Sequence, residues 1–288
     1  MSETLVSLWT AARQRLEAAG VETPVLDARL LLEAGAGVSR LDIVTDPRRA
    51  VSVEQTNATE ALVRRREARE PMSHILGKKA FWTFELNVTP DVLTPRPETE
   101  VLVEAALERL AKDRPARVLD LGVGSGAVLI ALLLERPNAV GVGVDASALA
   151  LDVARANAER LGVGDRASFH QGNWMTAPAA PFDMVVSNPP YIPSLHIDAL
   201  APEVALFEPR LALDGGVDGL AAYRAIAEVL PTFTAPGGAF ALEIGQGQAG
   251  AVAALLGAAG LETELPRRDL AGIERVVLGQ RPAATGLQ

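Results

Sequence analysis

The chain has 288 residues and a formal net charge of −9, from 27 Lys and Arg against 36 Asp and Glu, and 49% of its residues are hydrophobic. This balance indicates a folded protein of one or two domains and excludes a chain-wide basic surface for a nucleic-acid backbone. Cysteine is absent, which excludes disulfides, thiolate metal sites and cysteine nucleophiles. The three histidines (His74, His170, His196) share no spacing that suggests a site, so no metal is expected.

Residues 1–79 have the pattern of a small all-helical domain. Apolar residues recur at helical spacing over residues 1–20, and Thr23-Pro24 and the pair Ser52 and Gln55 are helix-start signals. No uninterrupted apolar run of a secretory signal or a membrane span is present. The sequence therefore predicts a cytoplasmic protein that makes no membrane contact.

A cluster of arginines follows on the last helix of this domain. Its members alternate with Glu67 and Glu70, which is typical of a solvated charged face. A docking surface for a protein partner is the sharper hypothesis. The cluster comprises Arg64, Arg65, Arg66 and Arg69.

Beyond residue 79 the pattern changes from helical to mixed. Alternating apolar residues over 80–93 predict a β-hairpin, which we take as a connector spanning 80–95. Strand and helix patterns then alternate through 96–288, which predicts an α/β domain with a doubly wound, mostly parallel sheet. The last apolar segment, 275–279, has no helix after it and is expected to be an antiparallel edge strand.

A glycine-rich loop follows the first strand of that sheet. The loop, Asp120-Leu121-Gly122-Val123-Gly124-Ser125-Gly126, opens a helix, and the next strand ends at Asp145. Glycines allow close approach of the backbone to a ligand, and a carboxylate at the next strand end can bind both ribose hydroxyls. The pattern predicts an adenosine-cofactor site, and read as Gly122-x-Gly124-x-x-Ala127 it also fits a dinucleotide fingerprint. An NAD-dependent oxidoreductase or a non-catalytic nucleotide-binding module therefore stays an alternative.

The turn Ser187-Asn188-Pro189-Pro190-Tyr191 follows the fourth strand, at the same end of the sheet. Two successive prolines remove two N–H donors, so the Asn188 side-chain oxygen and the Pro189 carbonyl can both accept from one –NH₂ group. Such a pair suits a planar carboxamide or exocyclic amine held in line with a sulfonium methyl group. Tyr191 can cover that planar group. Asp120, two residues before the first glycine, resembles the acidic position of class I methyltransferases, and this resemblance implies methyl transfer from S-adenosylmethionine to such a nitrogen.

With these motifs the chain resembles the release-factor glutamine methyltransferases, a family of class I S-adenosylmethionine-dependent enzymes. Nearly the whole chain takes part in the resemblance. The matching segments beyond the two motifs are Ile75-Leu76-Gly77, Thr94-Pro95-Arg96-Pro97-Glu98-Thr99-Glu100, Glu208-Pro209-Arg210-Leu211-Ala212-Leu213, Asp218-Gly219-Leu220, Leu242-Glu243-Ile244-Gly245 and Asp269-Leu270-Ala271-Gly272.

The resemblance implies transfer of a methyl group from S-adenosylmethionine to the side-chain amide nitrogen (N5) of the glutamine in the Gly-Gly-Gln motif of class 1 peptide chain release factors, which modulates translation termination. The fold it implies is a Rossmann-like methyltransferase domain over 96–288 behind a helical domain over 1–79 that docks the release factor. S-adenosylhomocysteine would be the product, and the enzyme would act as a monomer without a metal.

The resemblance also assigns roles to residues. It implies cofactor binding by Gly122, Val123, Gly124, Ser125, Gly126, Asp145, Asn173, Trp174 and Asn188. It implies substrate binding by Arg96, Glu98, Asn188, Pro189, Pro190 and Tyr191, of which Asn188, Pro189 and Tyr191 are the expected catalytic residues. Val123 and Asn173 depart from the residues that the family often has at these positions, Thr and an acidic residue.

Methylation of adenine N6 or guanine N2 in nucleic acid is the alternative within the same chemistry, because it uses the same Asn-Pro-Pro-Tyr arrangement. The charge of −9 and the lack of a long basic segment argue against it. Direct nucleic-acid binding is therefore not expected.

Overall fold

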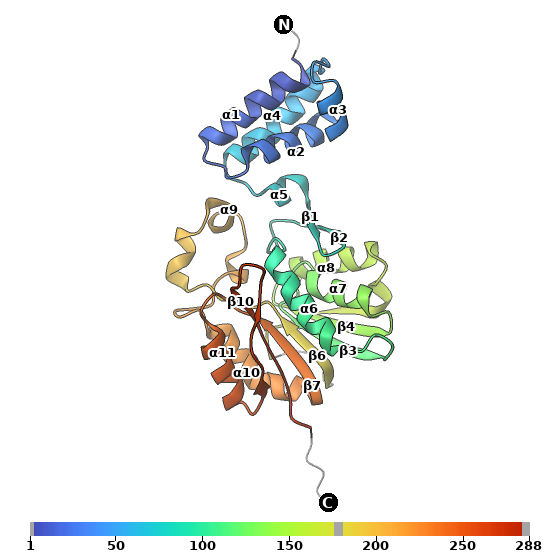
Figure 1. The fold of residues 1–288 in the computed structure, drawn as a ribbon, viewed down its shortest axis with the longest axis vertical. Helices are drawn as coiled ribbons and strands as arrows, with labels where there is room; N and C mark the ends of the chain where they lie inside the picture. Colours follow the sequence, from blue (N-terminus) through green and yellow to red (C-terminus); the bar gives the residue numbers. More distant parts are fainter. Residues whose placement is uncertain (1–2, 176–180, 284–288) are drawn as a thin grey trace, which may run out of the picture. The chain divides into compact units, whose positions relative to one another are not determined.

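The computed structural model describes residues 3–175 and 181–283, and the chain divides into two compact units (Figure 1). The helical unit comprises residues 1–77 together with the distant segment 201–207. The sheet unit comprises residues 78–200 and 208–288. A short piece of chain from the second half of the sequence therefore completes the N-terminal unit.

The helical unit is built from short amphipathic helices. At the start of α4 the Ser52 Oγ accepts from the Gln55 backbone N–H at 3.2 Å, and Gln55 Oε1 accepts from the Ser52 N–H at 3.0 Å, which confirms the predicted capping box. The predicted first helix begins at Leu5, and residues 1–2 lie outside the described residues. The helices are α1 (Leu5–Ala18), α2 (Pro24–Ala36), α3 (Arg40–Thr45), α4 (Val53–Glu67), α5 (Met72–Leu76) and α9 (Pro202–Ala205).

Ion pairs in the helical unit correct the prediction of a solvated arginine face. Arg66 is only 6% exposed, and its guanidinium donates to Asp27 at 2.7 Å and to Glu203 at 2.9 Å. Arg69 donates to the same Glu203 at 2.7 Å. The prediction is wrong for Arg66 because α4 packs against α2, which carries Asp27, and because segment 201–207 supplies Glu203. Arg64 is exposed, as predicted for this face.

The sheet unit begins with a hairpin, as predicted, but its strands lie within residues 78–87 and not across 80–93. Strands β1 (Lys78–Phe81) and β2 (Phe84–Asn87) pair antiparallel, with Lys78 opposite Asn87. Trp82 adopts a positive φ of 54° in the tight turn between them. The Trp82 backbone N–H donates to Glu100 at 2.8 Å, which ties the turn to α6 (Glu100–Arg109).

The central sheet has the predicted doubly wound, mostly parallel arrangement. Within the described residues its strand order is β5-β4-β3-β6-β7-β10-β8, and β9 also pairs with β10. The strands from β5 to β7 run parallel. Their bounds are β3 (Ala116–Leu121), β4 (Ala139–Asp145), β5 (Ala167–Gln171), β6 (Phe182–Ser187), β7 (Thr234–Glu243), β8 (Glu262–Thr263), β9 (Arg267–Arg268) and β10 (Glu274–Gln280).

Helices cover both faces of this sheet (Figure 1). Helices α6, α7 (Ala127–Glu135) and α8 (Ala148–Arg160) share one hydrophobic core with Val118 of β3, whereas α10 (Ala221–Phe233) and α11 (Ala249–Ala258) share the other with Leu119 of the same strand. Successive residues of a strand point to opposite faces, so one buried strand serves both cores.

The structure corrects one prediction about the sheet. Strand β10 pairs antiparallel with β7, as expected, but it is not an edge strand because β8 and β9 pair with its other side. Strands β8 and β9 have two residues each, which is too short to give a period-two pattern in the sequence.

Candidate active site

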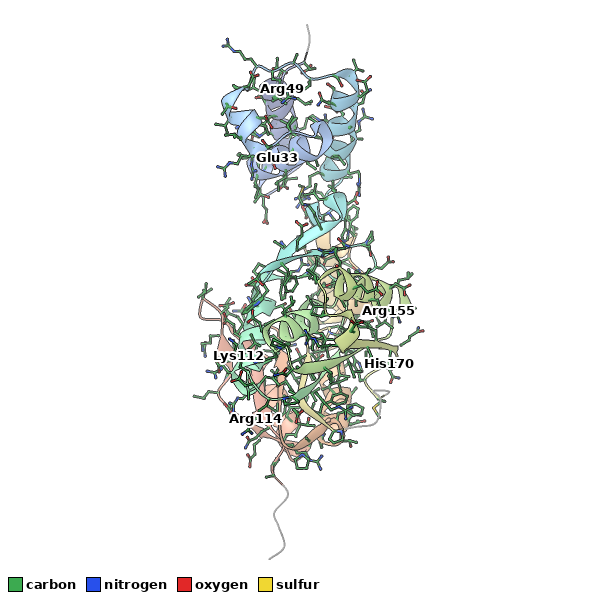
Figure 2. All side chains as sticks on the ribbon, turned by 90° about the vertical axis from the view of Figure 1, so that its right-hand side faces the viewer. Glu33, Arg49, Lys112, Arg114, Arg155 and His170 are labelled. Atoms are coloured by element: carbon green, nitrogen blue, oxygen red, sulfur yellow. The ribbon has the colours of Figure 1, made fainter. Side chains whose placement is uncertain are left out.

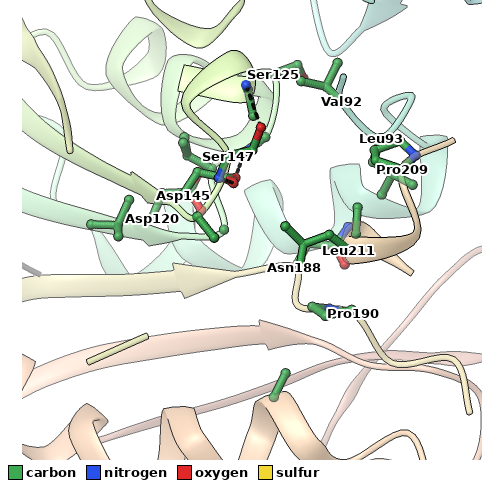
Figure 3. Close-up of a pocket in the computed structure, with 18 of the residues that line it drawn as sticks. Val92, Leu93, Asp120, Ser125, Asp145, Ser147, Asn188, Pro190, Pro209 and Leu211 are labelled. Atoms are coloured by element: carbon green, nitrogen blue, oxygen red, sulfur yellow. Dashed lines mark hydrogen bonds between the residues drawn. The ribbon is translucent and has the colours of Figure 1, made fainter. Parts of the chain in front are cut away.

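The carboxyl edge of the sheet carries a cavity of about 470 Å³. The glycine loop follows β3, Asp145 ends β4 and Asn188 follows β6, and Figure 3 shows Asp145 and Asn188 facing this same cavity. Carboxyl ends of parallel strands meet at one edge, where ligands of open α/β sheets bind. The volume lies in the usual range for small-molecule sites.

The glycine loop is held in a conformation that requires glycine. Gly122, Gly124 and Gly126 have φ values of 76°, 53° and 85°. A Cβ on Gly122 would lie 3.3 Å from the Trp174 ring, whereas one on Gly124 would meet nothing within 4 Å. Trp174 therefore packs directly on the loop, and the backbone at Gly124 is open to close approach by a ligand.

Asp145 connects the end of β4 to the glycine loop. Its Oδ2 accepts from the Gly124 backbone N–H and its Oδ1 accepts from the Ser147 N–H, both at 2.9 Å. A carboxylate offers about four acceptor positions, so acceptors remain for the two hydroxyls of a ribose.

Asp120 is the most deeply buried carboxyl group of the cavity. It is 2% exposed, and burial raises its pKa to about 7, with a smaller contribution from the charge of Asp145 and opposition from a backbone hydrogen bond at Leu129. A buried carboxyl group with such a pKa is stabilised in its charged form by a nearby cation. The residue is therefore suited to a positively charged ligand group.

The charged residues of the cavity wall distinguish between cofactor classes. Four are acidic and one is basic, namely Asp91, Asp120, Asp145, Asp214 and Arg96. The pyrophosphate of a dinucleotide would lie near carboxylates with one arginine to neutralise it, whereas the sulfonium and ammonium groups of S-adenosylmethionine are cationic. The open backbone at Gly124, the free acceptors of Asp145 and the Trp174 ring fit an adenosine. The residues present thus fit S-adenosylmethionine.

Hydrogen bonds from several elements brace the turn after β6. The Asn188 Nδ2 donates to Thr99 Oγ1 at 3.3 Å, and the preceding Ser187 Oγ donates to the Leu121 carbonyl at 2.6 Å. On the other side, Gln248 Nε2 donates to the Tyr191 carbonyl at 3.0 Å. The turn is therefore held in place from the glycine-loop strand, from the segment before α6 and from the start of α11.

The structure brings most of the predicted site residues to the cavity wall. Asn188 and Pro190 lie in it, as do the following predicted residues: Arg96, Gly122, Val123, Gly124, Ser125, Asp145, Asn173 and Trp174. The predicted residues outside the wall are Glu98, Gly126, Pro189 and Tyr191. The roles of all these residues stay predictions.

Gly126 and Tyr191 lie outside the cavity wall, and the structure shows what surrounds each of them. Gly126 is the N-terminal cap of α7, and its positive φ turns the loop into the helix. Tyr191 packs against the core beneath α10 and α11, and burial raises its pKa to about 12. Tyr191 is therefore a neutral phenol.

Arg96 reaches the cavity from the segment before α6. Its Nη2 donates to Glu208 Oε2 at 2.5 Å, and Glu208 is buried. Burial raises the pKa of Glu208, and the Arg96 charge opposes that effect. The pair fixes Arg96 on the cavity wall next to Pro209.

The histidines do not gather at a site. His74 is buried and His196 is exposed, and Figure 2 shows His170 on β5 at the surface near Arg155 of α8. Across residues 3–175 and 181–283, no group of three or more His, Asp or Glu side chains could hold a metal ion. In the same part of the chain no helix is long and apolar enough to span a bilayer.

Sequence reasoning gave no role to Glu243 or Gln248, although both contact the Asn188–Tyr191 turn. Gln248 Oε1 accepts from the nearby Gly245 N–H, but its Nε2 donates to the distant Tyr191 and Gly219 carbonyls, which no local pattern predicts. Glu243 does have a local signal in the sequence. It is an acidic residue at the end of an otherwise apolar strand, and acidic residues are rarely buried in such strands.

Family models match both parts of the chain. Residues 7–77 match the model described as the PrmC N-terminal domain, and residues 98–206 match the Methyltransferase small domain. The chain is 53% identical over 280 residues to the release factor glutamine methyltransferase of Caulobacter vibrioides, covering 97% of each chain. It is 51% identical over 270 residues to that of Rhodospirillum rubrum, covering 94% of this chain and 83% of the relative.

Solved structures with the same fold are distant in sequence. A methyltransferase from Pyrococcus furiosus is 14% identical with a TM-score of 0.51, covering 71% of this chain and 92% of that one. The hMettl16 catalytic domain, solved in complex with the MAT2A 3′UTR hairpin 6, is 12% identical with a TM-score of 0.57 and covers 69% of this chain and 76% of that one. These likenesses concern the fold alone.

The sheet order, the glycine loop and the cavity at the carboxyl edge define a class I methyltransferase. The chain belongs to the release factor glutamine methyltransferase family, since its relatives match it over nearly their full length. Family membership favours protein methylation over nucleic-acid methylation and over an NAD-dependent activity.

Proposed function

We propose that this enzyme transfers a methyl group from S-adenosylmethionine to the side-chain amide nitrogen of the glutamine in the Gly-Gly-Gln motif of class 1 release factors. One observation carries the proposal beyond family membership. Asp145 and Asn188, at the ends of β4 and β6, line the same cavity, which supports binding of an adenosine and an amide in one space. S-adenosylhomocysteine would be the product.

When bound, S-adenosylmethionine supplies an electrophilic methyl group on a positively charged sulfur. Asn188 Oδ1 and the Pro189 carbonyl would accept hydrogen bonds from the two N–H groups of the glutamine amide. These two acceptors orient the nitrogen so that its lone pair points at the methyl group, which is catalysis by positioning. The amide nitrogen becomes acidic only as the new bond forms, so no strong base is required. Tyr191 would cover the face of the amide, next to Pro190.

The cofactor residues divide by the part of the cofactor that each would hold. Asp145 would accept from the ribose hydroxyls, and Trp174 with Asn173 would pack beside the adenine. The glycine loop, Gly122 to Gly126 with Val123 and Ser125, would face the methionine portion, and the Asp120 carboxylate would attract its positive charge. Arg96 and Glu98 would close the substrate side.

The remaining expectations are part of the same proposal. The helical unit would bind the release factor, and of the arginine cluster Arg64 and Arg65 are the exposed members that could take part. Arg66 and Arg69 pair with carboxylates inside the helical unit and are less suited to docking. The enzyme would work as a cytoplasmic monomer, without a metal and without binding nucleic acid.

A methyl-transfer assay tests the proposal. Purified enzyme is incubated with S-adenosylmethionine labelled in the methyl group and one of three acceptors: a release factor, its Gly-Gly-Gln Gln→Ala variant, or duplex DNA. Label in the intact release factor alone is expected. Label in DNA, or equal label in the Gln→Ala variant, would contradict the proposal.

A further inference from the structure

Glu243 is a buried carboxylate next to the Asn188 turn. The proposed mechanism gives this carboxylate no role. It is the last residue of β7, and the register Ser187↔Leu242 places it beside Asn188, the residue that follows the neighbouring strand β6. It is 2% exposed, and among the described residues its Oε2 has no hydrogen-bond partner. A buried carboxylate is costly to retain unless neighbouring groups interact with it.

Two side chains of the site interact with this carboxylate. Thr99 and Asn188 both lower the pKa of Glu243 and so favour its charged form, which places their polar groups close to this carboxylate. Thr99 also accepts from Asn188 Nδ2 through its Oγ1, at 3.3 Å. Thr99 is itself buried and lines the cavity. Asn188 and Thr99 are therefore joined by a hydrogen bond, and both interact with the neighbouring Glu243 carboxylate.

The donor and acceptor capacities of these groups fix the direction of the hydrogen bonds. An ionised carboxylate can only accept, so in its interaction with Glu243 the Thr99 hydroxyl directs its single proton toward the carboxylate. The lone pairs of Thr99 Oγ1 are then available to accept from Asn188, which must present its Nδ2. The Asn188 Oδ1 is left as the atom that accepts from a ligand.

We propose that Glu243, acting through Thr99, is a positioning residue that fixes the orientation of the Asn188 amide and so presents Oδ1 to the substrate amine. The inference rests on the proposed function, in which Asn188 Oδ1 accepts from the glutamine amide. Neither residue touches the reacting atoms in this account. A flipped Asn188 amide would present Nδ2, a donor, to the donor –NH₂ of the substrate and would repel it.

The charge state of Glu243 sets this orientation. Burial raises the pKa of Glu243 to about 7, while the neighbouring Thr99 and Asn188 side chains and the charge of Arg275 oppose that rise. Glu98 raises it further. When protonated, Glu243 donates to Thr99, and the Thr99 hydroxyl is then free to donate to Asn188 Oδ1, which favours the flipped amide. The relay therefore orients Asn188 correctly only with Glu243 ionised.

Thr99→Val and Thr99→Ser test the relay, because valine keeps the shape of threonine without the hydroxyl and serine keeps the hydroxyl. Rates of release-factor methylation are measured per molecule able to bind S-adenosylhomocysteine, counted by titration. Thr99→Val should lower kcat about 10- to 100-fold, the loss typical of a misplaced reacting group, while KM for the release factor is unchanged. Thr99→Ser should restore most of the loss.

A double variant separates positioning from a general structural defect. Glu243→Gln keeps the size of the side chain but can both donate and accept, so it should lower kcat less than Thr99→Val does. Combining the two should give no greater loss than Thr99→Val alone, because both act through one path. Losses that multiply, or Thr99→Ser as slow as Thr99→Val, would overturn the inference.

The wild-type enzyme in the same assay distinguishes the inference from the function on which it rests. Wild-type enzyme that fails to methylate the release factor would overturn the proposed function. Wild-type enzyme that methylates it, together with Thr99→Val at the wild-type rate, would overturn the positioning role alone.

Discussion

The Asp145 carboxylate accepts a hydrogen bond from the backbone N–H of Gly124 at 2.9 Å, although Asp145 ends β4 and Gly124 follows β3. The same carboxylate also accepts from the Ser147 N–H at the start of α8. Asp145 therefore fixes the position of the glycine loop relative to the end of β4. This role is separate from the ribose contact that we propose for it.

Asp145→Ala should weaken binding of S-adenosylhomocysteine by about 1–3 kcal/mol, the range for lost hydrogen bonds to a charged acceptor. Loss of the Gly124 contact adds to the effect by freeing the loop. Isothermal titration calorimetry measures the change, with Asp152→Ala on the exposed surface of α8 as the matched control. Equal affinities of the two variants would place the ribose contact elsewhere.

Asn188→Ala should abolish methylation while the fold is largely kept. Asn188 is only partly buried and is a turn residue, so its side chain contributes little to packing. The loss would come from removing one of the two acceptors for the substrate amide. Single-turnover kinetics with a release factor measure it. Methylation near the wild-type rate would refute the acceptor mechanism.

Cofactor affinity should depend on pH through Asp120. Burial raises the pKa of Asp120 to about 7, so the carboxyl group is partly protonated in the free enzyme at neutral pH. A bound cation favours the ionised form, so binding releases a proton. Affinity for S-adenosylmethionine should therefore rise with pH up to about 7 and level off above it.

The control for this pH dependence is Asp120→Asn, which keeps the shape of the side chain but cannot ionise. Affinity of the variant is expected to be weaker at pH 8 and to change little between pH 6 and pH 8. Titrations at both pH values compare the two proteins. A variant with the same pH dependence as the wild type would assign the proton to another group.

Arg66→Ala should destabilise the protein by about 3 kcal/mol or more, because it leaves the buried Asp27 carboxylate without its ion-pair partner. Glu203 would keep Arg69 as a partner. Chemical denaturation measures the free energy of unfolding, and the control is Arg64→Ala at an exposed position of the same helix, expected within about 0.5 kcal/mol of wild type. Equal stabilities of the two variants would contradict this account.

Local motifs were predictable from the sequence because their signals are contiguous. The glycine loop, Asp145 and the turn at Asn188 each follow a strand with a clear apolar pattern, and the parallel order alone places them at one edge of the sheet. The capping box at Ser52 is equally local. Family resemblance added the substrate, which spacing could not supply.

Contacts between distant segments were not predictable in the same way. Glu203 lies 137 residues after Arg66 in the sequence but belongs to the same helical unit. No residue pattern near Arg66 predicts this partner. Glu243 lies close to Thr99 and Asn188 only because β7 pairs with β6 in the folded sheet. A two-residue strand such as β9 has no periodicity, so the interior position of β10 could not be read from its own sequence.

The central claim is that the acceptor is one glutamine side-chain amide. Mass spectrometry of a release factor, after incubation with the enzyme and S-adenosylmethionine and digestion to peptides, tests it most directly. The account predicts one added methyl group, on the side-chain amide nitrogen of the Gly-Gly-Gln glutamine, and none with Asn188→Ala enzyme. A methyl group on any other residue, or on the backbone, would contradict it.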